Sequence, residues 1–124
     1  MLERLKKRRD FLAAAKGRKA ARCGFVLEIG RRGDVAPARF GFTVSKRVSK
    51  KAVERNRIRR RLKEAVRLSA AEHAQDGCDY VLVGRRQAMT ESFDALRADL
   101  AGALAQASRP AARRVRDEAQ SSSR

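Results

Sequence analysis

The residues best suited to do chemistry in this sequence are the basic side chains of residues 46–63. Ten of these 18 residues are Lys or Arg, and only Glu54 is acidic. Arg presents a planar fork of donors that can bind one phosphate group through two hydrogen bonds. This density of cations predicts contact with a polyanion, and nucleic acid is the commonest polyanionic partner of such proteins.

Helical spacing divides residues 51–72 into two faces. The apolar stripe of this helix, typical of packing on a core, consists of Ile58, Leu62, Ala65, Val66 and Ser69. The polar stripe opposite it consists of Asn56, Arg60, Lys63 and Arg67, flanked by Arg57 and Arg59. A merely solvated basic face would carry acids one turn away, and only Glu54 and Glu64 are available. We therefore expect this face to contact nucleic acid, with Asn56 able to bond a base edge or a sugar hydroxyl.

The few aromatic residues gather in the first third of the chain. Phe11, Phe25, Phe40 and Phe42 all precede the basic helix. A sheet face that combines Phe with basic neighbours can stack on unpaired bases. The alternative is a place in the core, which we favour for Phe40 and Phe93 and which stays open for Phe11 and Phe25.

No combination of residues predicts catalysis by the protein itself. His73 is the only histidine, no Cys/His cluster has metal-ligand spacing, and no Gly-rich phosphate loop is present. We expect no catalytic residue, no metal site and no cofactor bound by the protein alone. Cys23 and Cys78 lie far apart and form no CxxC pair, so we expect buried thiols rather than a disulfide.

The composition fits one cytoplasmic domain. The chain has 124 residues and a net charge of +17, with 43% hydrophobic and 36% charged residues. No apolar run approaches the roughly 18 residues of a membrane span, and the charged N-terminus lacks the apolar stretch of a signal peptide. An anionic membrane is a weaker candidate partner, because Trp is absent and aromatic residues make up only 5%.

Periodicity predicts an α+β fold with the order α-β-β-α-β-α and room for an extra edge strand. The predicted helices cover residues 2–16, 51–72 and 91–107, and the predicted strands cover residues 24–30, 39–45 and 80–83. We expect the first two strands to pair as a hairpin. The second strand, the basic helix and the third strand form a β-α-β unit whose default crossover is right-handed. Residues 1–107 are expected to form a single RNA-binding domain, and residues 108–124 a basic, disordered tail.

Two neighbouring segments resemble the hallmark of bacterial ribonuclease P proteins. Residues 42–47 read Phe-Thr-Val-Ser-Lys-Arg, and residues 52–60 read Ala-Val-Glu-Arg-Asn-Arg-Ile-Arg-Arg. In that family an Arg-Asn-Arg helix, here Arg55 to Arg57, follows a strand that ends in a short Ser-or-Ala-Lys segment, here Ser45 and Lys46. The resemblance extends more loosely over about residues 2–105.

The resemblance implies a fold, an activity and partners. The fold would be the two-layer α-β sandwich shared with the second domain of a small-subunit ribosomal protein, with a left-handed β-α-β crossover. The catalytic centre would belong to an RNA, in which Mg²⁺ activates the water. The protein would bind that catalytic RNA and the 5′ leader of precursor tRNA, without an obligatory protein partner.

Pattern and resemblance together indicate the site residues. The expected RNA-binding residues are Lys46, Arg47, Arg55, Asn56, Arg57, Arg59, Arg60, Lys63 and Arg67. The resemblance implies that Phe11 lines a leader cleft between the first helix and the sheet, with Phe25 and Phe42 as further candidates. Ala15 stands where a second cleft aromatic is frequent, Glu28 where some members carry Tyr, and Lys63 where Arg is common. These departures imply weaker stacking and the loss of one bidentate fork.

Two other functions fit the sequence less well. A non-catalytic RNA-binding module, such as a ribosomal or RNA-chaperone protein, would share a β-α-β fold, but the Arg-Asn-Arg segment after Thr-Val-Ser-Lys favours ribonuclease P. A DNA-binding helix in a major groove is less favoured, because this helix carries a core stripe and lacks a helix-turn-helix partner.

Overall fold

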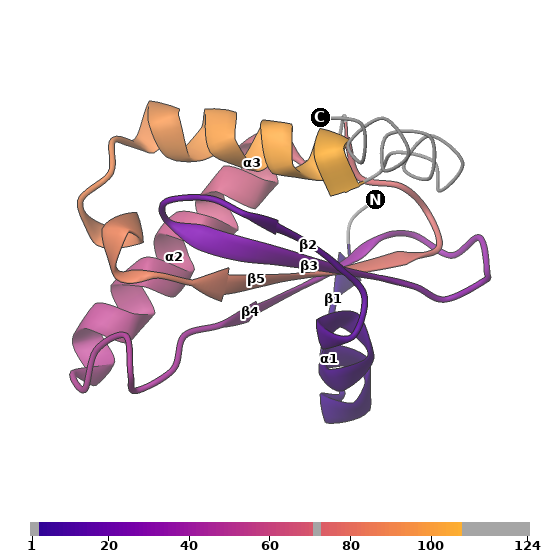
Figure 1. Cartoon of the computed structure of the whole chain (residues 1–124), viewed down its shortest axis with the longest axis horizontal. Helices are drawn as coiled ribbons and strands as arrows, with labels where there is room; N and C mark the ends of the chain where they lie inside the picture. The colour runs from indigo at the N-terminus through magenta and orange to yellow at the C-terminus, as the bar shows by residue number, and fades with distance from the viewer. Residues whose placement is uncertain (1–2, 71–72, 108–124) are drawn as a thin grey trace, which may run out of the picture.

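The computed structural model describes residues 3–70 and 73–107, so the predicted tail at 108–124 lies outside the described residues. Five strands form one mixed sheet in the order β1-β4-β5-β3-β2 (Figure 1). The strands are β1 Glu3–Arg4, β2 Arg18–Ala21, β3 Phe25–Arg31, β4 Arg39–Thr43 and β5 Cys78–Gly84. The helices are α1 Arg8–Ala15, α2 Ala52–Ser69, the 3-10 helix η1 Arg86–Met89 and α3 Phe93–Ala107.

The two faces of the sheet are covered differently. Helices α2 and α3 cover one face, and α1 lies on the opposite side near one end (Figure 1). Successive side chains of a strand point to opposite faces, so β3 buries Phe25, Leu27 and Ile29 on the α2–α3 side. The α+β prediction is confirmed, and α1 adds partial cover to the second face.

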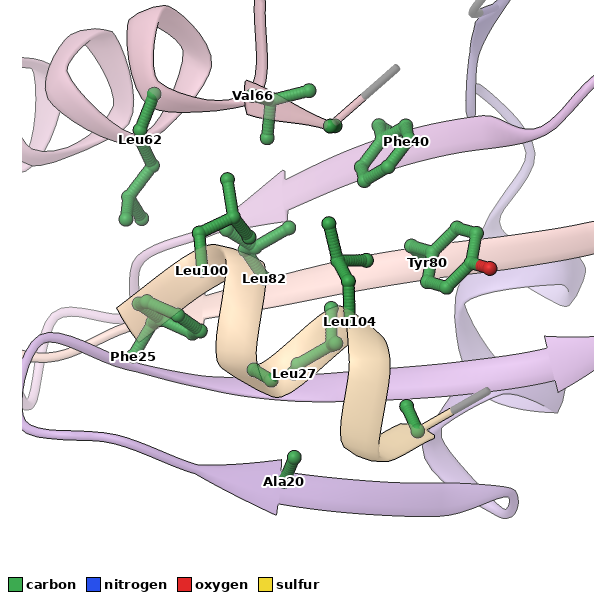
Figure 2. Close-up of a cluster of buried hydrophobic side chains, with 14 of the residues drawn as sticks. Ala20, Phe25, Leu27, Phe40, Leu62, Val66, Tyr80, Leu82, Leu100 and Leu104 are labelled. Carbon is green, nitrogen blue, oxygen red and sulfur yellow. The ribbon is translucent and has the colours of Figure 1, made fainter. Parts of the chain in front are cut away.

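The main core lies between the sheet and the two long helices. Figure 2 shows Leu100 and Leu104 of α3 lying against the strands that carry Leu27 and Leu82. The rings of Phe40 and Tyr80 stack with their centroids 4.9 Å apart. Four residues of the predicted α2 stripe are buried, which confirms its orientation: Ile58, Leu62, Ala65 and Val66.

The predicted hairpin between β3 and β4 is wrong, because β5 lies between these strands. β5 pairs antiparallel with β3, where Leu27 faces Leu82, and parallel with β4, where Phe42 faces Leu82. Tyr80, Val81 and Leu82 give β5 apolar side chains on both faces, which suits a central strand. The β4–α2–β5 unit is parallel and adjacent as expected, and its left-handed crossover stays a prediction.

The N-terminal region also departs from expectation. The predicted helix over residues 2–16 is interrupted, because Glu3–Arg4 forms β1 and α1 begins only at Arg8. The amide of Leu5 donates to the carbonyl of Phe40 at 2.9 Å, so pairing with distant β4 fixes this segment. β2 was missed because Arg18–Ala21 contains poor strand formers that are ordered by their partner β3.

A buried ion cluster joins α1, the β3–β4 loop and the sheet. Asp79 of β5 is only 4% exposed. Arg39 grips its carboxylate with two hydrogen bonds of 2.8 and 2.7 Å, and Arg32 donates to the same carboxylate. Arg39 also lies 3.4 Å from Asp10 of α1. These four residues, called the Asp79 cluster below, balance a buried charge with donors that satisfy it.

Two further expectations concern the burial of the cysteines and the absence of a membrane-spanning segment. Both cysteines are free thiols, and Cys78 is buried in β5 as expected. The expected burial of Cys23 is wrong, because it is exposed in the turn between β2 and β3. Among the described residues, no helix has the length and apolar character needed to cross a membrane.

Candidate RNA interface

The exposed side of α2 carries most of the predicted RNA-binding residues. Its exposed members are Asn56, Arg57, Arg60 and Arg67, and its half-buried members are Arg55, Arg59 and Lys63. Lys46 and Arg47 are exposed in the loop that precedes the helix. Because Ile58 and Leu62 are fully buried on the other side, the core fixes which way these cations point. We call the nine residues together the α2 basic face.

The cations of the α2 basic face differ in their partners. Arg67 donates to the Glu64 carboxylate at 2.7 Å, and this hydrogen bond lowers the pKa of Glu64. Arg59 donates to the amide oxygen of Asn56 at 2.9 Å. Within the described part of the chain, no carboxylate lies within 4.0 Å of the cations of Lys46, Arg47, Arg57 and Arg60. These four remain available for an external anion.

A set of hydrogen bonds around Ser49 and Glu54, called the Ser49–Glu54 lock below, holds the loop before α2 against the start of the helix. The buried Ser49 hydroxyl donates to the Glu54 carboxylate and accepts from the Lys51 amide at 3.2 Å. Arg55 donates to the Ser49 carbonyl at 2.9 Å. The bond from Ser49 is the main cause that lowers the pKa of Glu54, ahead of the charges of Arg86 and Lys51. The only acid of the basic segment is therefore used for positioning.

Sequence reasoning missed the Ser49–Glu54 lock. These residues are five apart, whereas the familiar capping box joins residues three apart. Glu54 was interpreted only as a possible neutralising charge for neighbouring arginines. Its closest basic neighbour is instead Arg86 of η1, 3.9 Å away, which also donates to the Val48 carbonyl at 3.1 Å.

On the other side of the sheet, Phe11 forms the wall of a shallow cleft of about 390 Å³. The cleft is lined by Lys6, Arg8, Phe11, Leu12 and Thr43. Phe11 can lie against β4 because Gly41 has no side chain, and a Cβ atom there would come within 2.5 Å of the ring. An apolar floor with cations at its rim suits a base and its phosphate. We call this site the Phe11 cleft, and leader binding there stays a prediction.

Lys19 bonds to both Ala15 and Glu28, the two positions where members of the family often carry an aromatic residue. Lys19 of β2 bonds the Glu28 carboxylate at 2.7 Å and the Ala15 carbonyl at 2.8 Å. Ala15 and Glu28 are both half-buried. The structure thus has an ion pair in place of aromatic side chains at these positions, and weaker stacking stays a prediction.

The other two predicted cleft residues lie elsewhere. Phe25 is fully buried on the α2–α3 side of the sheet, so its expected role in the cleft is wrong. Phe42 shares a strand face with Phe40 and therefore also points away from Phe11. The ammonium of Lys63 lies 6.0 Å from the centre of the Phe42 ring. Phe42 thus supports the α2 basic face instead of the Phe11 cleft.

The sequence profile of the family described as Ribonuclease P matches residues 2–108. The chain belongs to the ribonuclease P protein family. A ribonuclease P protein component from Gluconacetobacter diazotrophicus is 50% identical over 105 residues, which cover 84% of this chain and 90% of that protein.

Solved structures of ribonuclease P proteins share this fold. The protein from Staphylococcus aureus has a TM-score of 0.69 at 27% identity, over 85% of this chain and 94% of that one. The protein from Thermotoga maritima has a TM-score of 0.69 at 28% identity, over 84% and 96% of the two chains. The family predicted from the Arg-Asn-Arg segment is confirmed.

This ribonuclease P protein also contains one basic helix residue that turns away from the α2 basic face. Arg61 donates to the Glu91 carbonyl and lies 6.0 Å from the centre of the Phe93 ring. Burial raises the pKa of Glu91, and its hydrogen bond with Asp99 raises it further. The predicted core place of Phe93 holds only in part, because this ring is half-buried. Arg61 therefore connects α2 to the start of α3.

The described residues offer no obvious metal site. Across residues 3–70 and 73–107, no three His, Cys, Asp or Glu side chains come together in a way that could hold a metal ion. The two acids of the Asp79 cluster, Asp79 and Asp10, both form ion pairs with Arg39.

Proposed function

We propose that this chain, a ribonuclease P protein component of tRNA processing, acts as the protein subunit of a ribonucleoprotein endonuclease. It binds the catalytic RNA through the α2 basic face and the 5′ leader of precursor tRNA in the Phe11 cleft. Both contacts support removal of the leader to give the mature 5′ end. The observation that carries this proposal is that Arg57 and Arg60 are exposed, with no carboxylate within 4.0 Å among the described residues, on a helix whose other side is buried in the core.

The α2 basic face is suited to the RNA backbone. Arg57 and Arg60 are exposed on a helix that the buried Ile58 and Leu62 hold in place. Binding therefore requires these arginine side chains to move, but not the helix. Their forks match the geometry of a phosphate group. Phosphate contacts release counterions from RNA, which makes such binding strongly dependent on salt.

The Phe11 cleft is suited to a single strand. A base can stack on the half-buried ring of Phe11, while Lys6 and Arg8 reach the adjoining phosphates. Mature tRNA lacks the leader and cannot use this contact. The cleft therefore gives a physical reason for tighter binding of the precursor.

We assign the bond-breaking step to the catalytic RNA, where Mg²⁺ activates the attacking water, as the family resemblance implies. The residues of this chain bind, orient and partly neutralise RNA, and none is assigned a catalytic role. The holoenzyme is placed in the cytoplasm and needs no further protein partner under this proposal.

Reconstitution tests the proposal. Purified protein is mixed with ribonuclease P RNA and precursor tRNA at a low Mg²⁺ concentration, and leader removal is followed on a gel. We expect efficient removal only when protein and RNA are both present. A ribosomal or RNA-chaperone module would bind RNA without increasing leader removal, and that outcome would overturn the proposal. Cleavage by nuclease-free protein alone, abolished by a point mutation in it, would do so too.

A further inference from the structure

A groove of about 330 Å³ lies between the C-terminal half of α2 and the β1–β4 edge of the sheet. Its lining residues come from β1, β4 and α2: Glu3, Arg4, Phe40, Phe42, Lys63, Val66 and Arg67. Among the described residues, β1 pairs only with Arg39 and Phe40 of β4. β4 therefore has an open outer edge at Phe42, whose ring is half-buried. We call this site the Phe42 groove.

The floor of the Phe42 groove is apolar. Phe40 and Val66 are buried, and the Phe42 ring packs beside them on the α2 side of the sheet. Arg4 pairs in register with Phe40, so its side chain points to the same side. Glu3, the one acid among the described lining residues, precedes Arg4 in the strand, and alternation directs its side chain to the opposite face.

The rim of the Phe42 groove is cationic. In residues 3–70 and 73–107, neither Arg4 nor Lys63 has a carboxylate within 4.0 Å, whereas Arg67 is paired with Glu64. The ammonium of Lys63 lies 6.0 Å from the centre of the Phe42 ring. The groove therefore combines an aromatic ring with positive charge that the fold does not neutralise.

We propose that the Phe42 groove holds one unpaired nucleotide of the catalytic RNA, with its base stacked on Phe42 and its phosphate bound by Arg4. This inference rests on the proposed function. A base within a helix has both faces covered by its neighbours, so only an unpaired base can stack on a protein ring. Aromatic rings next to cations are the usual site for such nucleotides. The flexible stem of Lys63 allows its ammonium to move from the ring to the nucleotide.

Continuity with the α2 basic face favours the catalytic RNA as the source of this nucleotide. Lys63 and Arg67 belong to that face and also line the groove. The leader is assigned to the Phe11 cleft, and Phe11 and Phe42 lie on opposite faces of the sheet. The cationic rim favours an anionic occupant over an apolar segment of another protein.

The test uses Phe42→Leu, which keeps an apolar side chain but removes the aromatic face, and Phe42→Tyr, which keeps that face. Phe93→Leu is the matched control, because the Phe93 ring is also half-buried and lies 6.0 Å from the cation of Arg61, away from the α2 basic face. Arg4→Gln tests the rim. Its control is Arg9→Gln, since Arg9 is an exposed cation of α1 outside the groove.

Binding of each full-length variant to the catalytic RNA alone is measured across a salt series, after melting curves have established that the variant is folded. Phe42→Leu should bind roughly 5- to 150-fold more weakly, the range for one stacked base. Its salt slope should be unchanged, because stacking releases no counterions. Arg4→Gln should lower the slope by about 0.7–0.9 for one lost phosphate contact. Phe93→Leu and Arg9→Gln should bind as the wild-type protein does.

Acylation of the RNA 2′-hydroxyl groups, which reports the mobility of each nucleotide, locates the contact. One unpaired nucleotide should be unreactive with wild-type protein and with Phe42→Tyr, and reactive with Phe42→Leu. Arg4→Gln should restore reactivity at the same nucleotide. If Phe42→Leu does not fold, Arg4→Gln decides, and failure to restore that reactivity overturns the inference.

A lower salt slope for Phe42→Leu would mean that the ring only positions Lys63, and it would overturn the inference. Weakening that appears only after precursor tRNA is added, or an equal loss in Phe93→Leu, would do so too. Unchanged RNA binding in every variant would fit a groove that takes a protein segment instead. If wild-type protein promotes leader removal and Phe42→Leu binds the catalytic RNA equally well, only the groove assignment fails. If wild-type protein does not promote removal, the proposed function itself fails.

Discussion

Arginines of the α2 basic face and of the Asp79 cluster are the same residue type in opposite settings. Arg60 is exposed on α2, without a carboxylate within 4.0 Å in the part of the chain that the structure describes. Arg39 is half-buried and holds Asp79 with two hydrogen bonds. The charge of Arg60 is available to a binding partner, whereas the charge of Arg39 is neutralised within the fold.

The location of the acids, more than the number of arginines, decides which arginines are available for binding and which stabilise the fold. The chain has 31 basic and 14 acidic residues, so most cations lack an acid of their own. Asp79 and Asp10 lie in the sheet and on α1, where they organise Arg32 and Arg39. On α2 the acids Glu54 and Glu64 are turned to Ser49 and Arg67, which leaves Arg57 and Arg60 free of them.

The largest effect is expected from Asp79→Ala. Removing the shared buried carboxylate leaves Arg39 with Asp10 and Arg32 with the more exposed Asp34 as their remaining acidic partners. Breaking a buried ion pair in this way costs about 3–5 kcal/mol of unfolding free energy. Denaturant unfolding measures this loss. Asp34→Ala is the control, since its half-exposed carboxylate pairs with the same Arg32. A similar small loss for both variants would show that the cluster is not a structural centre.

A core cavity in α2 should have the next largest effect. Ile58 is fully buried beneath the α2 basic face. Ile58→Ala should cost about 2–5 kcal/mol of unfolding free energy because the cavity cannot fully close. Arg60→Ala, two residues away, should leave unfolding nearly unchanged. If the exposed-residue variant unfolds and the core variant stays stable, the orientation of the helix is wrong.

Removing the Phe11 ring tests the α1 side of the sheet separately from the α2 basic face on the other side. Phe11→Ala should weaken precursor binding more than mature tRNA binding, by about 1–3 kcal/mol for one stacked base. Binding of both RNAs to the holoenzyme measures the difference. Phe11 also packs against Leu5 and Val81, so the melting temperature of the variant is checked first. Equal losses for the two RNAs in a folded variant would contradict leader stacking.

Removing one charge from the α2 basic face should have a smaller, salt-dependent effect. Arg60→Ala should weaken binding to the catalytic RNA and lower the salt slope by roughly 0.7–0.9 for the lost phosphate contact. Arg67→Ala should change the slope less, because Glu64 already engages Arg67. Unchanged affinity and slope for Arg60→Ala would mean that this side chain does not touch RNA.

The smallest effect concerns Glu91, whose pKa is raised above its ordinary 4.5 by burial and by Asp99. A raised pKa favours the protonated carboxyl in the folded state, so stability is lost as the pH rises from 4.5 through the raised value. Glu91→Gln removes this ionisation and should raise the melting temperature at neutral pH. The two proteins should converge in acid. A constant difference across the pH range would contradict this cause.

The sequence predicts the α2 helix and its two faces because both follow from spacing within one segment. Ile58 and Arg60 fall on opposite sides in the structure as the helical period requires. The buried strand at Tyr80 is equally visible, because an apolar run needs no knowledge of its neighbours. The α+β class follows from these elements.

Features that depend on distant pairing could not be predicted in the same way. Nothing local in Phe25 or Phe42 shows which face of the sheet each ring occupies, and both lie opposite Phe11. The exposed Cys23 and strand β2 depend on where the turn to β3 falls. The Asp79 cluster joins residues from α1, the β3–β4 loop, β4 and β5 that are adjacent only after the sheet has formed.

The position of β5 determines when this sheet can be completed during synthesis. β5 lies at the centre of the order β1-β4-β5-β3-β2, yet it follows all four other strands in the chain. Until Cys78–Gly84 has left the ribosome, the β2–β3 pair and the β1–β4 pair have no strand to join them. Before that point the sheet cannot be completed, because both pairs need β5 between them. Such non-local pairing slows folding and leaves strand edges open to wrong partners, so early contact with RNA or a chaperone would protect the nascent protein.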